Sequence, residues 1–219
     1  MADTGSSTSR ADTRVLQAAH AAFRLATTRL ADATAKLPPS ALQPIIGSRW
    51  SFYAAVLHHH HHNEDDMLFP ALLAVRPEMG ALIDELEKDH RELASSIDVA
   101  GAVVSAFEKQ PDAAGQTAMH DGIVAVRDAF FPHLDVEDAQ LMPAYAESIP
   151  PKEWDRMDQK ALKSIPRPYL PTAVGALDEV MQGWPKDERP PPPPPPIRLM
   201  LALSWRKKWA QWYKPLLVS

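Results

Sequence analysis

The chain has 219 residues and a formal net charge of −5, so it lacks the basic surface that non-specific nucleic-acid binding requires. Hydrophobic residues make up 45% of it, enough to bury a core, and the absence of cysteine excludes disulfides, zinc–thiolate sites and iron–sulfur clusters. Nine histidines and 22 prolines, against eight glycines, stand out.

The N-terminal residues 1–13 are rich in Ser, Thr, Ala and Asp and are expected to be flexible. They lack the apolar stretch of a signal peptide. No run along the chain approaches the ~18 apolar residues that a membrane-spanning helix needs. We therefore expect a cytoplasmic protein.

Apolar residues recur every three to four positions in four long segments, a pattern that predicts four amphipathic helices. These segments begin near Asp12, near Ile45, near Pro77 and after Pro111. Long helices with short connections pack most simply as an antiparallel up-down four-helix bundle, which we place at residues 14–147. The expected fold class is all-α.

The composition changes after Ile149. Short helices are expected within residues 148–189, followed by an unbroken run of prolines over 190–196 that favours a stiff extended spacer. The tail, residues 197–219, interleaves aromatic and basic side chains and predicts an amphipathic helix. Such a helix suits an anionic membrane surface or a protein partner. The alternative is that the tail folds back on the bundle or covers a second subunit.

The second and fourth helical segments contain the same short sequence motif, which we call the phrase. The stretch from His60 to Pro70 aligns without a gap with the stretch from His133 to Pro143, and His, Glu, Asp, Leu and Pro occupy matching positions. The first and third segments each contribute one further histidine, His20 in the first and His90 in the third. The chain thus consists of two similar helical hairpins.

The spacing within the phrase predicts a metal centre. Residues four apart on a helix are neighbours on one face, so each histidine and the glutamate after it can bind one centre. Four imidazoles and two carboxylates suit a pair of iron or similar ions better than magnesium or calcium, which prefer all-oxygen ligands. Glutamates from opposed helices can bridge the two ions. The candidate ligands are His20, His60, Glu64, His90, His133 and Glu137.

A run of five histidines, His58 to His62, offers several candidates for one ligand position. The fourth segment determines the register, because His133 has no histidine neighbours. Carrying its spacing back to the second segment selects His60. His58, His59 and His62 point mostly elsewhere on the helix.

On these residues the sequence resembles the hemerythrin-like (HHE) family of cation-binding four-helix bundles, from about Val15 to Tyr145. The resemblance implies two iron ions joined by an oxo or hydroxo bridge, in preference to zinc or manganese. It also implies dioxygen, peroxide or nitric oxide as the small ligand. Some relatives use the position after the second-helix histidine as an extra ligand, which makes His61 an additional candidate.

One departure from the family bears on function. Oxygen-carrying hemerythrins have a further histidine one turn after the third-helix ligand, and that position is Ala94 here. The departure favours peroxidase-like or catalase-like turnover over reversible oxygen carriage, unless His61 supplies a fifth histidine. The alternatives are a non-catalytic sensor of dioxygen, nitric oxide or iron, and a metal-binding adaptor that docks through its tail.

Overall fold

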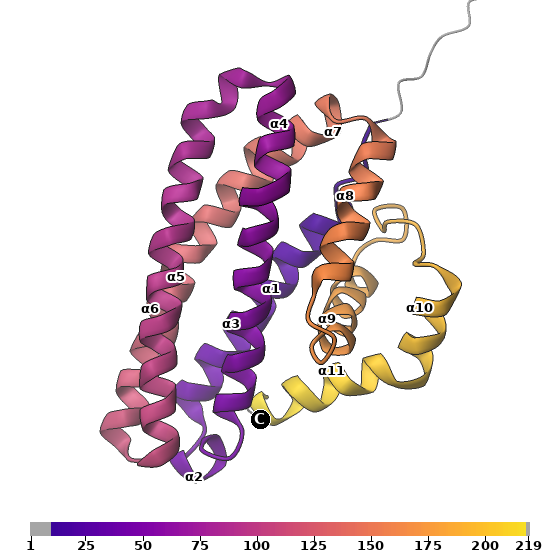
Figure 1. The fold of residues 1–219 in the computed structure, drawn as a ribbon. Coiled ribbons are helices and arrows are strands. Elements are labelled where there is room, and N and C mark those ends of the chain that lie inside the picture. Colours follow the sequence, from indigo (N-terminus) through magenta and orange to yellow (C-terminus); the bar gives the residue numbers. More distant parts are fainter. Residues whose placement is uncertain (1–9, 218–219) are drawn as a thin grey trace, which may run out of the picture.

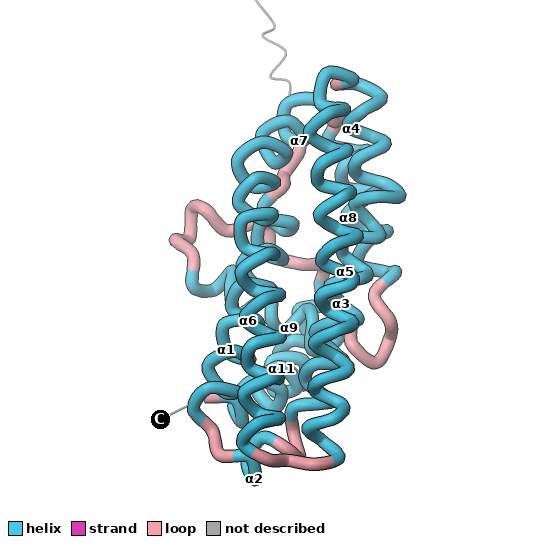
Figure 2. Tube along the Cα trace, turned by 90° about the vertical axis from the view of Figure 1, so that its left-hand side faces the viewer, coloured by secondary structure: helices cyan, strands magenta, loops and turns pink. Residues whose placement is uncertain are grey.

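The computed structural model describes residues 10–217, and every regular element in this part of the chain is helical, which confirms the all-α expectation (Figure 1). Four long helical stretches pack against one another through the pairs α1/α6, α5/α6, α3/α5 and α1/α3 (Figure 2). Their antiparallel order stays a prediction. The stretches are α1 (Arg14–Lys36), α3 with α4 (Ile46–Asn63 and Phe69–Val75), α5 (Gly80–Lys109) and α6 with α7 (Ala113–Val136 and Met142–Ser148). The connections contain the short helices α2 (Pro39–Leu42) and η2 (Pro77–Met79).

The second and fourth stretches are each interrupted by one π-helical turn at the repeated phrase, η1 (Glu64–Leu68) and η3 (Glu137–Leu141). The backbone N–H of Phe69 donates to the carbonyl of Glu64, and that of Met142 donates to the carbonyl of Glu137. The next residue in both copies is a proline, which donates no hydrogen bond and crowds the turn before it. A wider turn relieves this crowding. The periodicity predicts continuous helices. The repeated proline explains why these helices are interrupted instead.

The interior contains two apolar clusters, and the candidate ligands lie between them along the helices. The first cluster includes Leu57, Leu93 and Phe130. The second includes Leu68, Leu86 and Leu141. These six residues come from the second, third and fourth helical stretches, and each stretch supplies one residue to each cluster. In each stretch the candidate histidine lies, in sequence, between these two apolar residues. The polar centre is thus enclosed by hydrophobic side chains on both sides.

A C-terminal extension packs on one side of the four stretches (Figure 1). In it α8 contacts α3, α9 contacts α1, and α11 contacts α9. Helix α10 begins inside the predicted proline spacer, because a proline in the first helical turn needs no N–H partner. The elements are α8 (Pro151–Ser164), α9 (Leu170–Gly183), α10 (Pro195–Met200), η4 (Leu201–Trp205), α11 (Arg206–Tyr213) and η5 (Lys214–Leu216).

The aromatic tail folds back on the rest of the chain. Trp209 and Trp212 stack with ring centroids 4.9 Å apart and are 2% and 7% exposed. The guanidinium of Arg29 on α1 lies 4.1 Å from the ring centroid of Tyr213 and forms an ion pair of 2.8 Å with Glu179. The single helix predicted for the tail is instead broken by the π-helical turn η4. Of the two arrangements expected for the tail, the structure shows folding back, and the aromatic face expected for a membrane is largely used in this packing.

The two chain ends fall partly outside the described residues. Of the predicted flexible segment 1–13, residues 1–9 lie outside, as do residues 218 and 219 of the predicted tail. Within residues 10–13, the N–H of Ala11 donates to the carbonyl of Ala146 at 3.1 Å, and Ala11 is buried. This part of the segment is therefore attached to α7. No helix within residues 10–217 is long and apolar enough to cross a membrane.

Candidate metal centre

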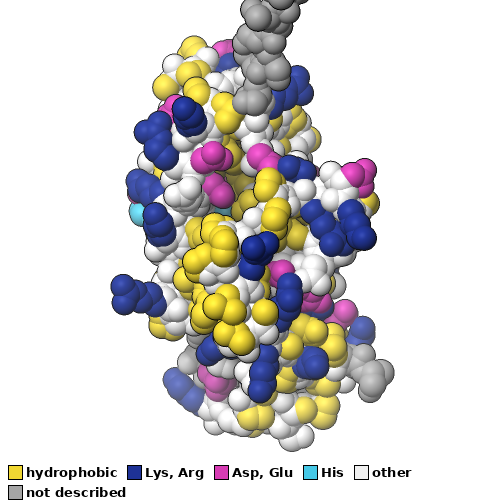
Figure 3. All heavy atoms as spheres, turned by 90° about the vertical axis from the view of Figure 1, so that its right-hand side faces the viewer, with side chains coloured by type: hydrophobic (Ala, Val, Ile, Leu, Met, Phe, Trp, Pro, Cys, Tyr) yellow, Lys and Arg dark blue, Asp and Glu magenta, His cyan; other side chains and the backbone are white. Residues whose placement is uncertain are grey.

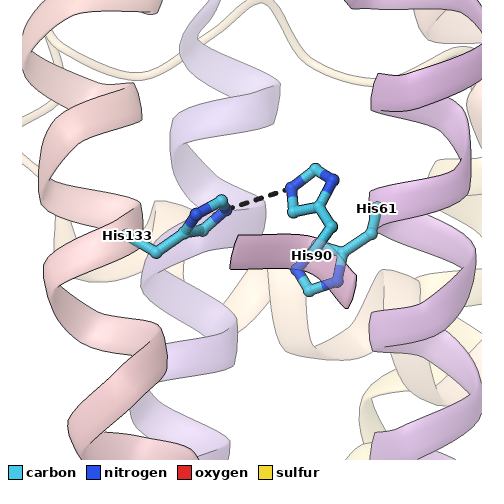
Figure 4. A group of neighbouring side chains, drawn as sticks. All are labelled: His61, His90 and His133. Atoms are coloured by element: carbon cyan, nitrogen blue, oxygen red, sulfur yellow. Dashed lines mark hydrogen bonds between the residues drawn. The ribbon is translucent and has the colours of Figure 1, made fainter. Parts of the chain in front are cut away.

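All six predicted ligands and His61 come together in the interior as two groups of donor atoms. Within each group the donor atoms lie within 4.8 Å of one another. None of the seven side chains is more than 9% exposed. The first group consists of His20, His60, Glu64 and Glu137, and the second consists of His61, His90 and His133 (Figure 4).

The two glutamates lie between the groups. Glu64 places Oε1 3.4 Å from Nε2 of His60 and Oε2 3.7 Å from Nε2 of His90. Glu137 places Oε2 3.6 Å from Nε2 of His20 and 3.5 Å from Nε2 of His133. Two atoms that each bind one ion at ~2.1 Å lie ~3.0–3.4 Å apart, so these separations are close to those of ligands that share an ion. Each carboxylate therefore lies within reach of a histidine from each donor group.

Two aspartates orient the lone histidines, which are His20 and His90, the candidate histidines outside the repeat. The Nδ1–H of His20 donates to Asp138, and that of His90 donates to Asp65, both at 2.7 Å. Each aspartate directly follows the glutamate of its phrase and reaches the lone histidine of the other hairpin. Because a carboxylate only accepts, the proton resides on Nδ1 and the Nε2 lone pair faces the centre. This aspartate is present in both copies of the repeat, but the spacing within one helix does not predict its role.

The surroundings of the second group suit a cation. Nε2 of His90 and Nε2 of His133 share a hydrogen bond of 3.1 Å (Figure 4). The Nδ1 atoms of both rings face carboxylates, at 3.5 Å from Asp89 in the case of His133. With both Nδ1 atoms protonated, the hydrogen bond needs one ring to hold an additional proton. Burial, with neighbouring His90 and His20, lowers the pKa of His133 to about 3, which opposes that charge. A metal ion that accepts both lone pairs resolves the conflict.

The remaining donor atoms are unsatisfied. Among the described residues, buried polar atoms without a hydrogen-bond partner include Nε2 of His20, His60 and His61, one oxygen of Glu64 and both carboxylate oxygens of Glu137. Burial raises the pKa of both glutamates well above its usual range, and nearby carboxylates add to this effect. Leaving such groups unpaired in an apolar interior costs several kcal/mol. The residues present therefore fit a centre that binds metal cations.

The histidine run divides into residues with different surroundings. His60 and His61 face the first and second donor groups, and the ring of His61 stacks on that of His90 at 4.2 Å. His59 shares a hydrogen bond of 2.7 Å with the hydroxyl of Ser164 on α8. The side chain of His62 is 69% exposed. The additional candidate His61 is therefore placed with the other candidates, which the spacing of the fourth helix alone did not indicate.

Tyr145 in α7 lies outside the repeated pattern that predicts the ligands. It is 1% exposed, and its hydroxyl has no hydrogen-bond partner within residues 10–217. Burial, with the charges of Glu64 and Glu137, raises the pKa of this phenol well above its usual value. The buried hydroxyl thus interacts with the charges of Glu64 and Glu137. Its place near the candidate ligands could have been predicted from its position in the sequence, because it lies two helical turns after Glu137 on the same helical face.

Comparison with known proteins supports the geometry. Residues 11–145 match the hemerythrin HHE cation-binding domain family, and the chain belongs to that family. The matched region contains both donor groups and the aspartates behind them, and it ends before the C-terminal extension. Neither the curated proteins nor the solved structures that were compared with the chain produced a match.

Proposed function

We propose that this member of the hemerythrin HHE cation-binding family holds two iron ions and binds or turns over dioxygen or peroxide. The observation that supports this most directly is the convergence of five imidazoles and two carboxylates in two donor groups. Nitrogen and oxygen donors in this ratio suit iron, whereas structural zinc sites are typically closed by four ligands that often include thiolates. Two iron ions would supply the electrons for chemistry with dioxygen or peroxide. The proposal includes the up-down antiparallel order of the four long stretches.

The residues of the chain have separate tasks in this proposal. The imidazoles bind the ions, Glu64 and Glu137 link the two ions, and Asp65 and Asp138 keep the lone histidines oriented. The apolar clusters on both sides exclude water and strengthen these interactions. The group containing His20 has two imidazoles and the other group has three. Because both glutamates would serve both ions, we expect the small ligand to bind on the side with fewer imidazoles, that of His20.

His61 favours a second candidate function, a sensor or reversible binder without turnover. Its imidazole adds a fifth histidine and compensates for the alanine at position 94, which in oxygen carriers is a histidine. A ligand set of this size leaves less room for a second exchangeable ligand. The adaptor function expected for the tail has weaker support, because Trp209 and Trp212 are packed inside the protein.

Iron analysis and optical spectroscopy on the purified full-length protein test the proposal first. We expect one iron for each donor group and absorption typical of an oxygen-bridged pair. Glu137→Ala should lose iron, whereas Glu147→Ala, an exposed glutamate paired with Arg10, should retain it. Zinc at full occupancy in place of iron would contradict the proposal.

Peroxide consumption separates the two candidate functions. If iron-loaded protein consumes peroxide and Glu137→Ala does not, the enzyme is supported. If the protein binds iron and dioxygen or nitric oxide but leaves peroxide intact, the sensor is supported. Absence of iron binding would reject both.

A further inference from the structure

A large apolar cavity lies between the four long stretches and the C-terminal extension. Its volume is about 670 Å³, within the range of pockets that enclose small organic molecules. One wall comes from α1 and α3, and the other comes from α8, α9, the proline segment and α10. Figure 3 shows this face of the molecule, where hydrophobic side chains gather around a hollow with acidic groups near its edge. More than half of the residues that line the cavity therefore come after position 145, beyond the region that matches the family.

The walls are mostly aliphatic. Leucine, isoleucine, valine and alanine side chains from both walls dominate the lining, among them Leu16, Val56, Leu162, Leu177, Ile197 and Leu201. These side chains suit a flexible hydrocarbon, because they provide contact area without hydrogen-bond partners. A water-filled space of this composition gains free energy when an apolar molecule displaces the water.

The charged groups of the lining are mainly acidic. Four aspartates line the cavity and one lysine does so, namely Asp12, Asp155, Asp158, Asp178 and Lys163. Asp12 is paired with Arg14 at 2.7 Å and Asp178 with Arg206 at 2.6 Å, so the negative charge of the lining comes mainly from Asp155 and Asp158. Burial, with Asp155 and Asp12 nearby, raises the pKa of Asp158 to about 6. A carboxylate-bearing ligand such as a fatty acid would add to the repulsion. An uncharged ligand avoids it.

The cavity adjoins the candidate metal centre. His60 forms part of its lining, and so does Phe23, whose ring centroid is 5.0 Å from that of His60. The same imidazole places Nε2 3.4 Å from Oε1 of Glu64 in the first donor group. A molecule in the cavity therefore contacts the wall of the donor group that has only two imidazoles.

We propose that this cavity binds an uncharged aliphatic molecule, of the class of a medium-chain alcohol, beside the His20 and His60 side of the centre. The binding requires only the two walls of the cavity. The further step, that such a molecule is a substrate or effector of the centre, rests on the proposed function. The C-terminal extension thereby gives this chain a ligand class that the matched region alone does not provide.

Displacement of a fluorescent probe tests the proposal on the full-length protein. We expect the uncharged dye N-phenyl-1-naphthylamine to bind with increased fluorescence and 1-dodecanol to displace it. Dodecanoate, which has the same chain length and a negative charge, should require a concentration about tenfold higher or more, because carboxylates line the site. Equal displacement by the two compounds would overturn the proposed selectivity.

Two variants on α9 locate the binding. Leu177 lines the cavity, whereas Val180, also half-buried on the same helix, does not. Leu177→Trp should reduce dye binding at least severalfold, and Val180→Trp should leave it unchanged. If Leu177→Trp does not fold, Val56→Trp on α3 fills the opposite wall. Dye binding that survives in a folded cavity variant would overturn the proposal.

Two further measurements separate the cavity proposal from the proposed metal function and from a dimer interface at the same site. Dye and dodecanol should still bind after iron is removed with a chelator. A protein that takes up no iron and still binds both compounds would contradict only the proposed metal function. Light scattering gives the molar mass in solution. A dimer that Leu177→Trp dissociates, together with no dye binding, would assign the cavity to a second copy of the chain and overturn the small-molecule proposal.

Discussion

Replacement of His61 by alanine tests the centre most directly, because the chain contains a matched control next to it. His61 is 4% exposed, its Nε2 has no hydrogen-bond partner among the described residues, and it belongs to the second donor group. The side chain of His62 is 69% exposed and forms an ion pair of 3.0 Å with Asp66 at the surface. The two substitutions remove the same atoms from adjacent positions, so only the first should weaken metal binding.

The expected size of the effect follows from mass action. An ion present at one hundred times its Kd stabilises the folded state by ~2.7 kcal/mol. For a chain of this length, 1 kcal/mol shifts Tm by ~2–4 °C, so each ion should raise Tm by ~5–11 °C. Loss of an outer hydrogen-bond partner alone lowers metal affinity ~10–100-fold. If losing His61 lowers it by a hundredfold, the contribution of the second ion falls to ~0.4 kcal/mol at the same metal concentration.

Calorimetry with and without chelator, together with iron analysis, measures this effect. The Tm difference between iron-loaded and chelated protein should fall by ~5–9 °C in His61→Ala and remain unchanged in His62→Ala. Comparing loaded with chelated protein cancels the cost of the cavity that the alanine leaves. At the same metal concentration the variant should keep the first donor group filled and the second about half filled. An unchanged Tm difference in His61→Ala, or the same loss in both variants, would refute the assignment of His61 to the centre.

Three other substitutions have distinct expected results. Asp138→Asn removes the charge that orients His20 and should weaken iron binding ~10–100-fold in a chelator competition, whereas an unchanged affinity would exclude this support role. Arg29→Met leaves Glu179 without its ion-pair partner and should lower the free energy of unfolding by ~1–3 kcal/mol, less than for a fully buried pair; a urea midpoint within error of wild type would contradict this. Phe130→Ala empties a fully buried site and should cost ~3–5 kcal/mol in the same assay, and a loss below ~1 kcal/mol would show that the site collapses.

The helical class was predictable from the sequence because each helix shows its own period. The interruptions of those helices were harder to predict. Both π-helical turns begin at a glutamate of the repeat and precede its proline, so the signal was present, yet the apolar period alone predicts a continuous helix. A single wide turn changes the direction of every side chain after it without changing the pattern of residue types.

The position of the tail required the tertiary structure. Its aromatic and basic residues suit a membrane, a partner or the chain's own surface equally well, because hydrophobic burial has no direction and does not specify the covering surface. The structure places Trp209 and Trp212 in the core and the guanidinium of Arg29 beside Tyr213. The cavity depends on the same packing, since residues far apart in the chain form its walls.

By itself the sequence determined which residues can act together within a helix. Four-residue spacing places His60 with Glu64 and His133 with Glu137 on one helical face, whatever the rest of the chain does. Only the tertiary structure decided that His61 joins the second donor group, since this depends on how α3 is rotated against its neighbours. It also decided that the aspartate after each glutamate of the repeat holds a histidine of the other hairpin. Contacts between helices depend on their relative rotation and distance, which local periodicity does not determine.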